Sequence, residues 1–232
     1  MRAGDGLVPM TDRRWLKEYV AEAQAADAKY APLGLRVKVG LEVDYFPGGE
    51  GRIAQALAGL PLDFLLCAIH YLEGGRLSAR GPAVEYFRGT TPREALAEYG
   101  RRLEAAAASG LFDSVAHLDI YRKYGELVHG PGSFAPWETL LEPGLAAVAA
   151  ASMTVELNLS PLRRGGQEPH PSGGLLRVCR DLGIAPLTVG SDSHSPEVMG
   201  LGYQEGRDVL RRAGFTAVRA YTGREAHLLE LA

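Results

Sequence analysis

Strand-like and helical patterns alternate along almost the whole chain. The apolar runs of strand length are 35–45, 62–72, 112–120, 152–160, 186–189 and 215–223. The helical segments are 13–31, 51–60, 91–110, 136–151, 172–183 and 197–213. Strands that are separated by helices imply parallel βαβ units, and their continuous apolar character fits burial on both faces of a sheet. The pattern predicts an α/β barrel with six strands, although a barrel of this type normally opens on a strand and this pattern opens on a helix.

The bulk composition narrows the class of protein. The 232 residues, 46% of them hydrophobic, suit a single domain over 1–232. The formal charge of −3 does not create a positive electrostatic field that would attract nucleic acid or an anionic membrane. No stretch approaches the ~18 apolar residues of a membrane span, and the start has no apolar signal-peptide core. Cys67 and Cys179 lie in apolar segments and are interpreted as core thiols. We expect a soluble protein of a reducing compartment, the cytoplasm.

A short motif, "PLTVGSDSHSPEVMG" at 186–200, ends a predicted strand with polar residues. Asp192 and His194 are two residues apart, so in an extended chain both side chains leave the same face. Ser195 and Pro196 are typical of the start of a helix. A carboxylate beside an imidazole can share one metal ion or form a buried hydrogen-bonded pair, and the motif alone leaves both open.

Other strands also carry potential ligands toward their carboxyl ends. Glu42, His70 and His117 occupy these positions on three further strands. In parallel barrels the carboxyl ends of the strands form one mouth, where the active sites of that fold lie. Each residue alone could be an ordinary core or rim group. Together with Asp192 and His194 they predict a site for zinc, iron or manganese, which would make hydroxide available as a nucleophile near neutral pH.

A second polar cluster lies in "ELNLSPLRRGGQEPHPSGG" at 156–174. Arg163 and Arg164 could grip a phosphate through a bidentate fork, or they could belong to a solvated surface loop. His170 and nearby glycines precede a helix whose N-terminus favours anions. No Walker loop, G-x-G-x-x-G or G-x-S-x-G motif occurs, which argues against nucleotide-binding folds and serine hydrolases.

The ordered segments "GLEVDYFPG", "AIHYL", "AHLD", "ELNLSPLRR" and "GSDSH" resemble the histidinol-phosphate phosphatases of the PHP (polymerase and histidinol phosphatase) superfamily. The similarity runs from about Pro9 to beyond Gly214. It implies a seven-stranded (β/α) barrel with a trinuclear metal centre. It also implies hydrolysis of L-histidinol phosphate to L-histidinol in histidine biosynthesis.

The resemblance assigns roles to the candidate residues. Glu42, His70 and His117 would form one metal site. Asp192, with Glu42 bridging, would serve a second site, and His194 a third. The resemblance implies a metal-bound hydroxide that attacks phosphorus at a centre formed in part by Asp192 and His194. Side chains from the second cluster would hold the substrate: Arg163 and Arg164 its phosphate, Glu156 its amino group, with His170 beside them.

The family's opening strand with His-x-His and its second strand ending in Thr-Asp-His do not appear in this sequence. We therefore expect a barrel that lacks the first two βα units, at most one firmly bound ion, and weak or absent phosphatase activity. Two alternatives are a PHP hydrolase of another phosphoester and a non-catalytic remnant that acts as a binding module. A homo-oligomer is also compatible with the sequence.

Overall fold

The computed structural model describes residues 13–184 and 187–231. The start of the family similarity, at residues 9–12, lies outside the described residues. So does the first residue of the strand expected at 186–189.

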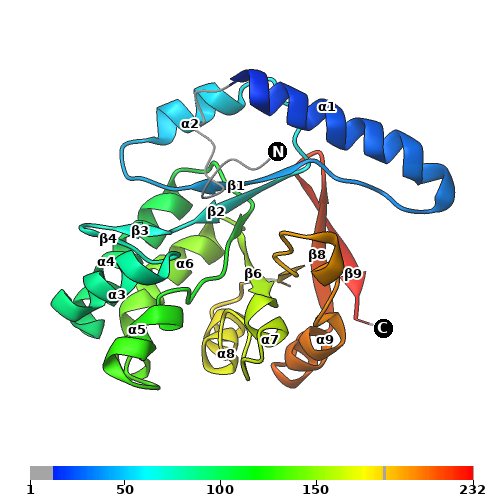
Figure 1. Ribbon diagram of the computed structural model, residues 1–232. Helices are drawn as coiled ribbons and strands as arrows, with labels where there is room; N and C mark the ends of the chain where they lie inside the picture. Colours follow the sequence, from blue (N-terminus) through cyan, green and yellow to red (C-terminus); the bar gives the residue numbers. More distant parts are fainter. Residues whose placement is uncertain (1–12, 185–186, 232) are drawn as a thin grey trace.

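A curled sheet of parallel strands forms the centre of the fold (Figure 1). Its strand order is β1-β2-β5-β6-β7, and each neighbouring pair is parallel. The strands are β1 (Gly40–Asp44), β2 (Phe64–Ala68), β5 (Ser114–Val115), β6 (Thr154–Asn158) and β7 (Thr188–Gly190). Among the described residues β1 and β7 are the sheet edges and no strand joins them. The expectation of an incomplete barrel is confirmed as a half-barrel.

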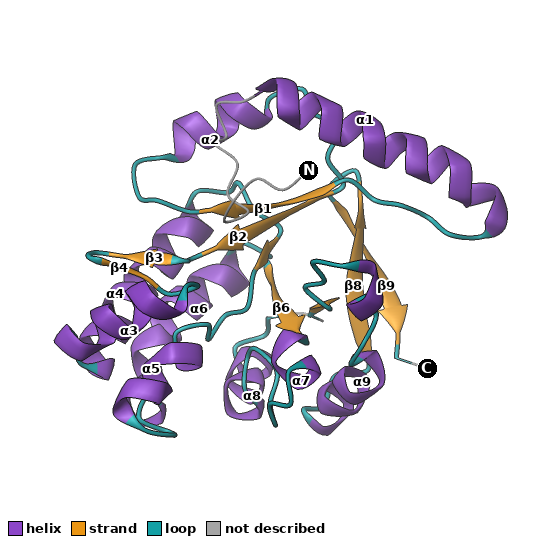
Figure 2. Ribbon diagram, in the orientation of Figure 1, coloured by secondary structure: helices purple, strands orange, loops and turns teal. Residues whose placement is uncertain are grey.

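Helices connect the strands and lie mostly along the outer face of the curl (Figure 2). The α-helices are α1 (Arg13–Tyr30), α2 (Glu50–Leu57), α3 (Arg80–Gly89), α4 (Pro92–Ala108), α5 (Arg122–His129), α6 (Glu142–Ala150), α7 (Ser160–Arg163), α8 (Gly173–Asp181) and α9 (Tyr203–Arg212). The 3₁₀ helices are η1 (Ala31–Leu33), η2 (Ala135–Leu141) and η3 (Pro196–Val198). None of the described helices is long and apolar enough to cross a membrane.

Two antiparallel pairs lie outside the curled sheet. The small pair is β3 (Tyr71–Leu72) with β4 (Gly75–Arg76), and the larger is β8 (Ala217–Thr222) with β9 (Glu225–Glu230). The strand expected over 215–223 is present as β8, but among the described residues it pairs antiparallel with β9 and is not a sixth strand of the curled sheet. Among the described residues, two backbone hydrogen bonds tie this hairpin to the rest of the fold: Arg219 N–H donates to Leu187 O at 3.2 Å, and Arg224 N–H, in the turn between β8 and β9, donates to Asp63 O at 3.0 Å.

The expectation of one long helix over 197–213 is also wrong. Gly200 and Gly202 have φ of 76° and 89°, a left-handed conformation that glycine adopts without a steric cost. They separate η3 from α9. Helices α3 and α5 were not anticipated, because both lie between the segments whose patterns predict a strand or a helix.

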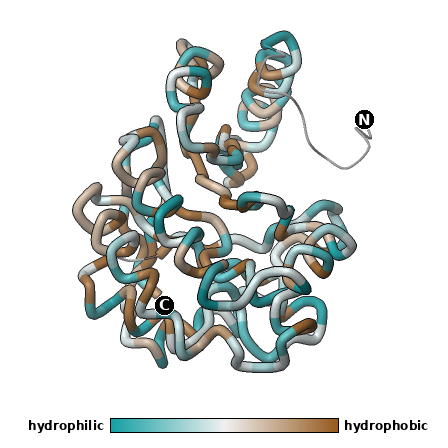
Figure 3. Tube along the Cα trace, turned by 90° about the vertical axis from the view of Figure 1, so that its left-hand side faces the viewer, coloured by the Kyte–Doolittle hydropathy of each residue, from teal (hydrophilic) through white to brown (hydrophobic). Residues whose placement is uncertain are grey.

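The sheet places its apolar side chains in two sets. Leu65 and Cys67 of β2 join the main core between the sheet and the helices, whereas Leu66 and Ala68 form a small cluster with Ala116. This alternation follows from the two-residue period of a strand. In Figure 3 the hydropathy alternates along the helical coils, as expected for helices with one face on a core.

Helix α4 has a capping box at its start. The Thr91 hydroxyl accepts a hydrogen bond from Glu94 N–H at 3.3 Å, and the Glu94 carboxylate accepts one from Thr91 N–H at 2.9 Å. This arrangement satisfies two backbone donors that a helix start leaves free.

Replacing Thr91 with alanine should lower the free energy of unfolding by about 1 kcal/mol, because one of these donors loses its partner. Urea unfolding followed by circular dichroism measures the change. Thr139→Ala, at an exposed threonine of η2, is the matched control. An equal loss in both variants would contradict the capping role.

Candidate metal centre

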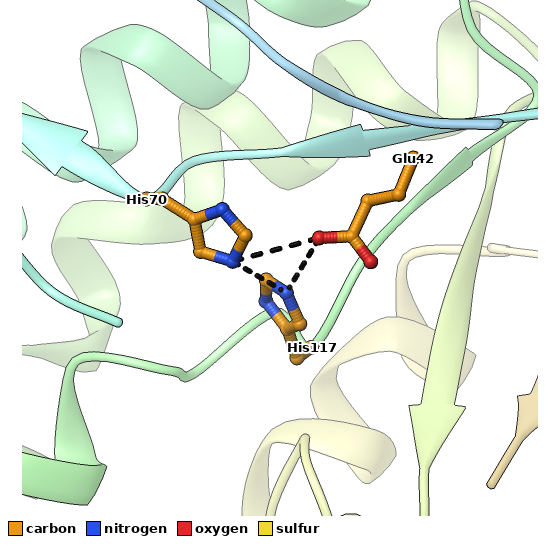
Figure 4. A group of neighbouring side chains, drawn as sticks. All are labelled: Glu42, His70 and His117. Atoms are coloured by element: carbon orange, nitrogen blue, oxygen red, sulfur yellow. Dashed lines mark hydrogen bonds and ion pairs between the residues drawn. The ribbon is translucent and has the colours of Figure 1, made fainter. Parts of the chain in front are cut away.

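Three neighbouring strands bring three ligand side chains together (Figure 4). Glu42 lies within β1, His70 follows β2 by two residues, and His117 follows β5 by two residues. Because β1, β2 and β5 are adjacent and parallel, their carboxyl ends meet at one edge of the sheet. We call Glu42, His70 and His117 the ligand group.

The ligand group has the spacing that one transition-metal ion requires. His70 Nε2 lies 3.0 Å from His117 Nε2, and Glu42 Oε1 lies 3.3 Å from His117 Nε2 and 3.5 Å from His70 Nε2. Ligands on a tetrahedral zinc ion, with bonds of about 2.0–2.1 Å, are about 3.3 Å apart. Two imidazoles and a carboxylate are also a donor set that zinc, iron and manganese accept. The residues therefore fit the ion that the sequence predicted.

His70 is oriented by a residue that the sequence reasoning missed. Its Nδ1 donates to Asp44 Oδ1 at 2.7 Å. Because an ionised carboxylate can only accept, the ring proton is on Nδ1 and the Nε2 lone pair faces the ligand group. Asp44 follows Glu42 by two residues on β1, so the strand period was the signal that could have found it.

Replacing Asp44 with alanine should weaken metal binding about 10- to 100-fold, because His70 loses the partner that fixes its ring. Titration calorimetry with zinc measures the dissociation constant. Asp181→Ala removes an exposed aspartate of α8 and is the control. An unchanged dissociation constant in Asp44→Ala would refute the orienting role.

His117 is held by its backbone as well as by its ring. Its N–H donates to the buried Glu156 carboxylate at 3.0 Å, and its φ is 27°. Its Nδ1 is buried and has no hydrogen-bond partner in the part of the chain that the structure describes. The ring therefore contacts the ligand group through Nε2 alone.

Burial and charge have opposite effects on the pKa values of His117 and Glu42. Burial alone would lower the pKa of His117, but the hydrogen bond and negative charge of Glu42, with Glu156 and Asp192 nearby, raise it. Burial alone would raise the pKa of Glu42, but the hydrogen bond and charge of His117, with His70 and His194, lower it. Glu42 is therefore a carboxylate at neutral pH and can act as an anionic ligand.

Asp192 and His194 lie beside the ligand group without joining it. Asp192 has φ 49°, so the expectation of an extended chain with both side chains on one face is wrong. His194 instead turns back, with Nδ1 3.0 Å from the Asp192 carbonyl and 3.6 Å from its carboxylate. The His194 side chain is 86% exposed. Both charges still act on the ligand group, because Asp192 raises the pKa of His117 and His194 lowers that of Glu42.

The two arginines of the second cluster contact different partners. Arg163 donates to the carbonyl oxygens of Ser191 and Asp192, and Arg164 donates to Ser160 Oγ at 2.9 Å. The Arg163 guanidinium therefore contacts the segment that carries Asp192 and His194.

Glu156 lies within reach of the ligand group. It is buried on β6, and burial raises its pKa although the charge of His117 opposes this. Gly190 provides the space for its carboxylate, because a Cβ at that position would be 2.1 Å from Glu156 Oε1.

His170 is a buried residue with a buried partner. Its Nδ1 contacts the Asp119 carboxylate, whose other oxygen accepts from Ser172 N–H at 2.8 Å and from Arg122 at 3.1 Å. Its backbone pairs with Asn158 at the end of β6. Asp119 is fully buried and was not singled out from the sequence, although it lies two residues after His117.

Curated relatives of the chain share one name. A probable histidinol-phosphatase of Deinococcus radiodurans is 31% identical over 202 residues, which cover 86% of this chain and 73% of that protein. A histidinol-phosphatase of Lactococcus lactis is 25% identical over 209 residues, covering 90% of this chain and 76% of that protein. No protein-family model matches the chain.

A solved structure has a similar fold. The crystal structure of histidinol phosphate phosphatase from Lactococcus lactis, complexed with zinc, L-histidinol and phosphate, superposes with a TM-score of 0.79. The superposition covers 91% of this chain and 79% of that chain at 24% identity. The similarity extends over nearly the whole described half-barrel.

Proposed function

The chain belongs to the histidinol-phosphatase family, and from that premise we propose that it hydrolyses L-histidinol phosphate to L-histidinol and phosphate with a divalent transition-metal ion. The observation that carries the proposal is the ligand group of Glu42, His70 and His117, whose three donor atoms all lie within 4.8 Å of one another. Because the donors come from three separate strands, the fold itself assembles the site.

The residues around the ligand group have different roles. Asp44 keeps the His70 ring in the orientation that points Nε2 at the ligand group, and Glu156 holds the backbone of His117. A bound ion would supply Lewis acidity toward the phosphoryl oxygens of the substrate. The carboxylate of Glu42 offsets part of the positive charge that such an ion brings.

Four further side chains are assigned to the substrate and the reaction. We assign Asp192 and His194 to the reaction, because they follow β7 at the same carboxyl edge of the parallel sheet as the ligand group. Glu156 is an acidic side chain beside His117, which suits the ammonium group of L-histidinol phosphate. Arg164 carries a positive charge in the segment after β6, which suits the phosphate.

His170 is also assigned to the substrate side of the site. It lies at the end of β6, where its backbone pairs with Asn158, and Asp119 fixes the direction of its ring. We therefore assign it to the wall of the same site.

Release of inorganic phosphate from L-histidinol phosphate tests the proposal. After a chelator has removed bound metal, the protein should release phosphate when zinc or manganese is added, and a chelator in the assay should stop the reaction. Para-nitrophenyl phosphate and glycerol phosphate, assayed in parallel, test the alternative of another phosphoester. Hydrolysis of these esters alone would refute the substrate, and no hydrolysis of any ester with any metal would refute the activity.

A further inference from the structure

Three consecutive carbonyl oxygens at the end of β7 and just after it accept hydrogen bonds from the segment that follows β6. Leu159 N–H donates to Gly190 O at 2.8 Å. The two terminal nitrogens of Arg163 donate to Ser191 O and, at 3.2 Å, to Asp192 O. We call residues 190–194 the rim segment. All three donors come from the five residues that follow β6, so the ends of two neighbouring strands are joined side by side.

Arg163 is well suited to this contact. A guanidinium is a planar fork with fixed N–H directions, and it remains charged at any pH the protein meets. The two carbonyl oxygens are acceptors only, so each donor–acceptor pairing is unambiguous. The two contacts use one N–H of each terminal nitrogen, out of the five N–H donors of the guanidinium.

The rim segment has a conformation that requires support. Asp192 is not glycine, yet its φ is 49°, and residues in such sparsely populated regions persist where their surroundings determine them. His194 Nδ1 donates to the same Asp192 carbonyl that Arg163 contacts. Since a carbonyl only accepts, this bond places the ring proton on Nδ1 and leaves the Nε2 lone pair of His194 facing outward.

We propose that Arg163 is a positioning residue that holds the rim segment in its left-handed turn and so sets the place of Asp192 and His194 beside the ligand group. The proposal rests on the proposed function for its consequence in catalysis, but its structural part does not depend on any activity. Arg164 differs, because its guanidinium contacts Ser160 and not the rim segment.

Backbone ¹⁵N relaxation of the full chain tests the structural part. In the unchanged protein the amides of residues 191–194 should have order parameters of about 0.85, as in rigid backbone. In Arg163→Gln the order parameters of these amides should fall below about 0.6. Arg164→Gln is the matched control and should leave them unchanged. The amides of β2 should be the same in all variants, which verifies that each one is folded. Unchanged order parameters in Arg163→Gln would overturn the proposal.

Arg163→Lys provides a second variant that keeps the positive charge and loses the planar fork. Its order parameters at residues 191–194 should also lie below those of the unchanged protein. Values equal to the unchanged protein would overturn the requirement for two directed donors, and this comparison stands even where Arg163→Gln does not fold.

The kinetic part separates positioning from substrate binding. In Arg163→Gln, kcat for L-histidinol phosphate should fall about 10- to 100-fold, because displaced groups lose their alignment, while KM stays within about twofold. A raised KM with unchanged order parameters would show that Arg163 binds the phosphate, and would overturn the proposal. If the unchanged protein releases no phosphate, the proposed function fails, while the order parameters still decide the role of Arg163.

Discussion

Replacing His70 with alanine should abolish metal-dependent phosphate release from L-histidinol phosphate. His70 supplies one of three donors in the ligand group, and its Nε2 lies within 3.5 Å of both other donor atoms. A catalytic metal contributes several kcal/mol to the transition state. Since about 1.4 kcal/mol corresponds to a factor of ten in rate, we expect a loss of at least about 10³-fold in kcat/KM. Initial rates of phosphate release at saturating zinc measure the loss.

His227→Ala is the control for that experiment. His227 lies on the exposed strand β9, remote in sequence from the ligand group, so its removal should leave the rate unchanged. A His70→Ala variant that folds and keeps more than about a tenth of the rate would show that the activity does not depend on this group.

Replacing Asp119 with alanine should destabilise the fold more than any surface change. The carboxylate is fully buried and holds three partners: His170, Ser172 N–H and Arg122. Its removal leaves these donors without their acceptor in the interior, and such losses cost about 3–5 kcal/mol. Urea unfolding of the metal-free protein should show this decrease in the free energy of unfolding.

Asp181→Ala is the matched control for Asp119. The Asp181 carboxylate is 65% exposed and pairs with Arg180 on the surface, where an ion pair is worth about 0–1 kcal/mol. Equal effects of the two substitutions would contradict the view that Asp119 organises the interior around His170.

Local patterns predicted much of the fold. Apolar runs of strand length placed all five parallel strands. The three inner strands, β2, β5 and β6, are buried along nearly their whole length, as a strand covered on both faces is. The ends of the strands were harder to predict. Strand β5 has only two residues, Ser114 and Val115, and the expected strand over 112–120 includes a turn in which His117 has a positive φ.

The ligand group could be predicted for a simple physical reason. Parallel topology brings the carboxyl ends of neighbouring strands to one edge, so Glu42, His70 and His117 had to be close together once β1, β2 and β5 were adjacent. No side-chain detail was needed for that inference.

The contacts around the ligand group depend on tertiary geometry that periodicity does not contain. The turn at Asp192 reverses the direction of His194, and the reach of Arg163 across to β7 depends on how two loops pack. The β8–β9 hairpin depends on a tight turn after Thr222, which was not distinguished from the end of a last strand.

The zinc content of the chain after exhaustive dialysis shows whether Glu42, His70 and His117 hold an ion. Within the part of the chain that the structure describes, Glu42, His70 and His117 are the one group of three donors close enough to share an ion, and three protein ligands suffice for a zinc site. Elemental analysis should therefore find one zinc ion per chain. A protein that retains no zinc would contradict the claim that these three residues form a metal site, and two or three retained ions per chain would show that other side chains supply ligands the account does not include.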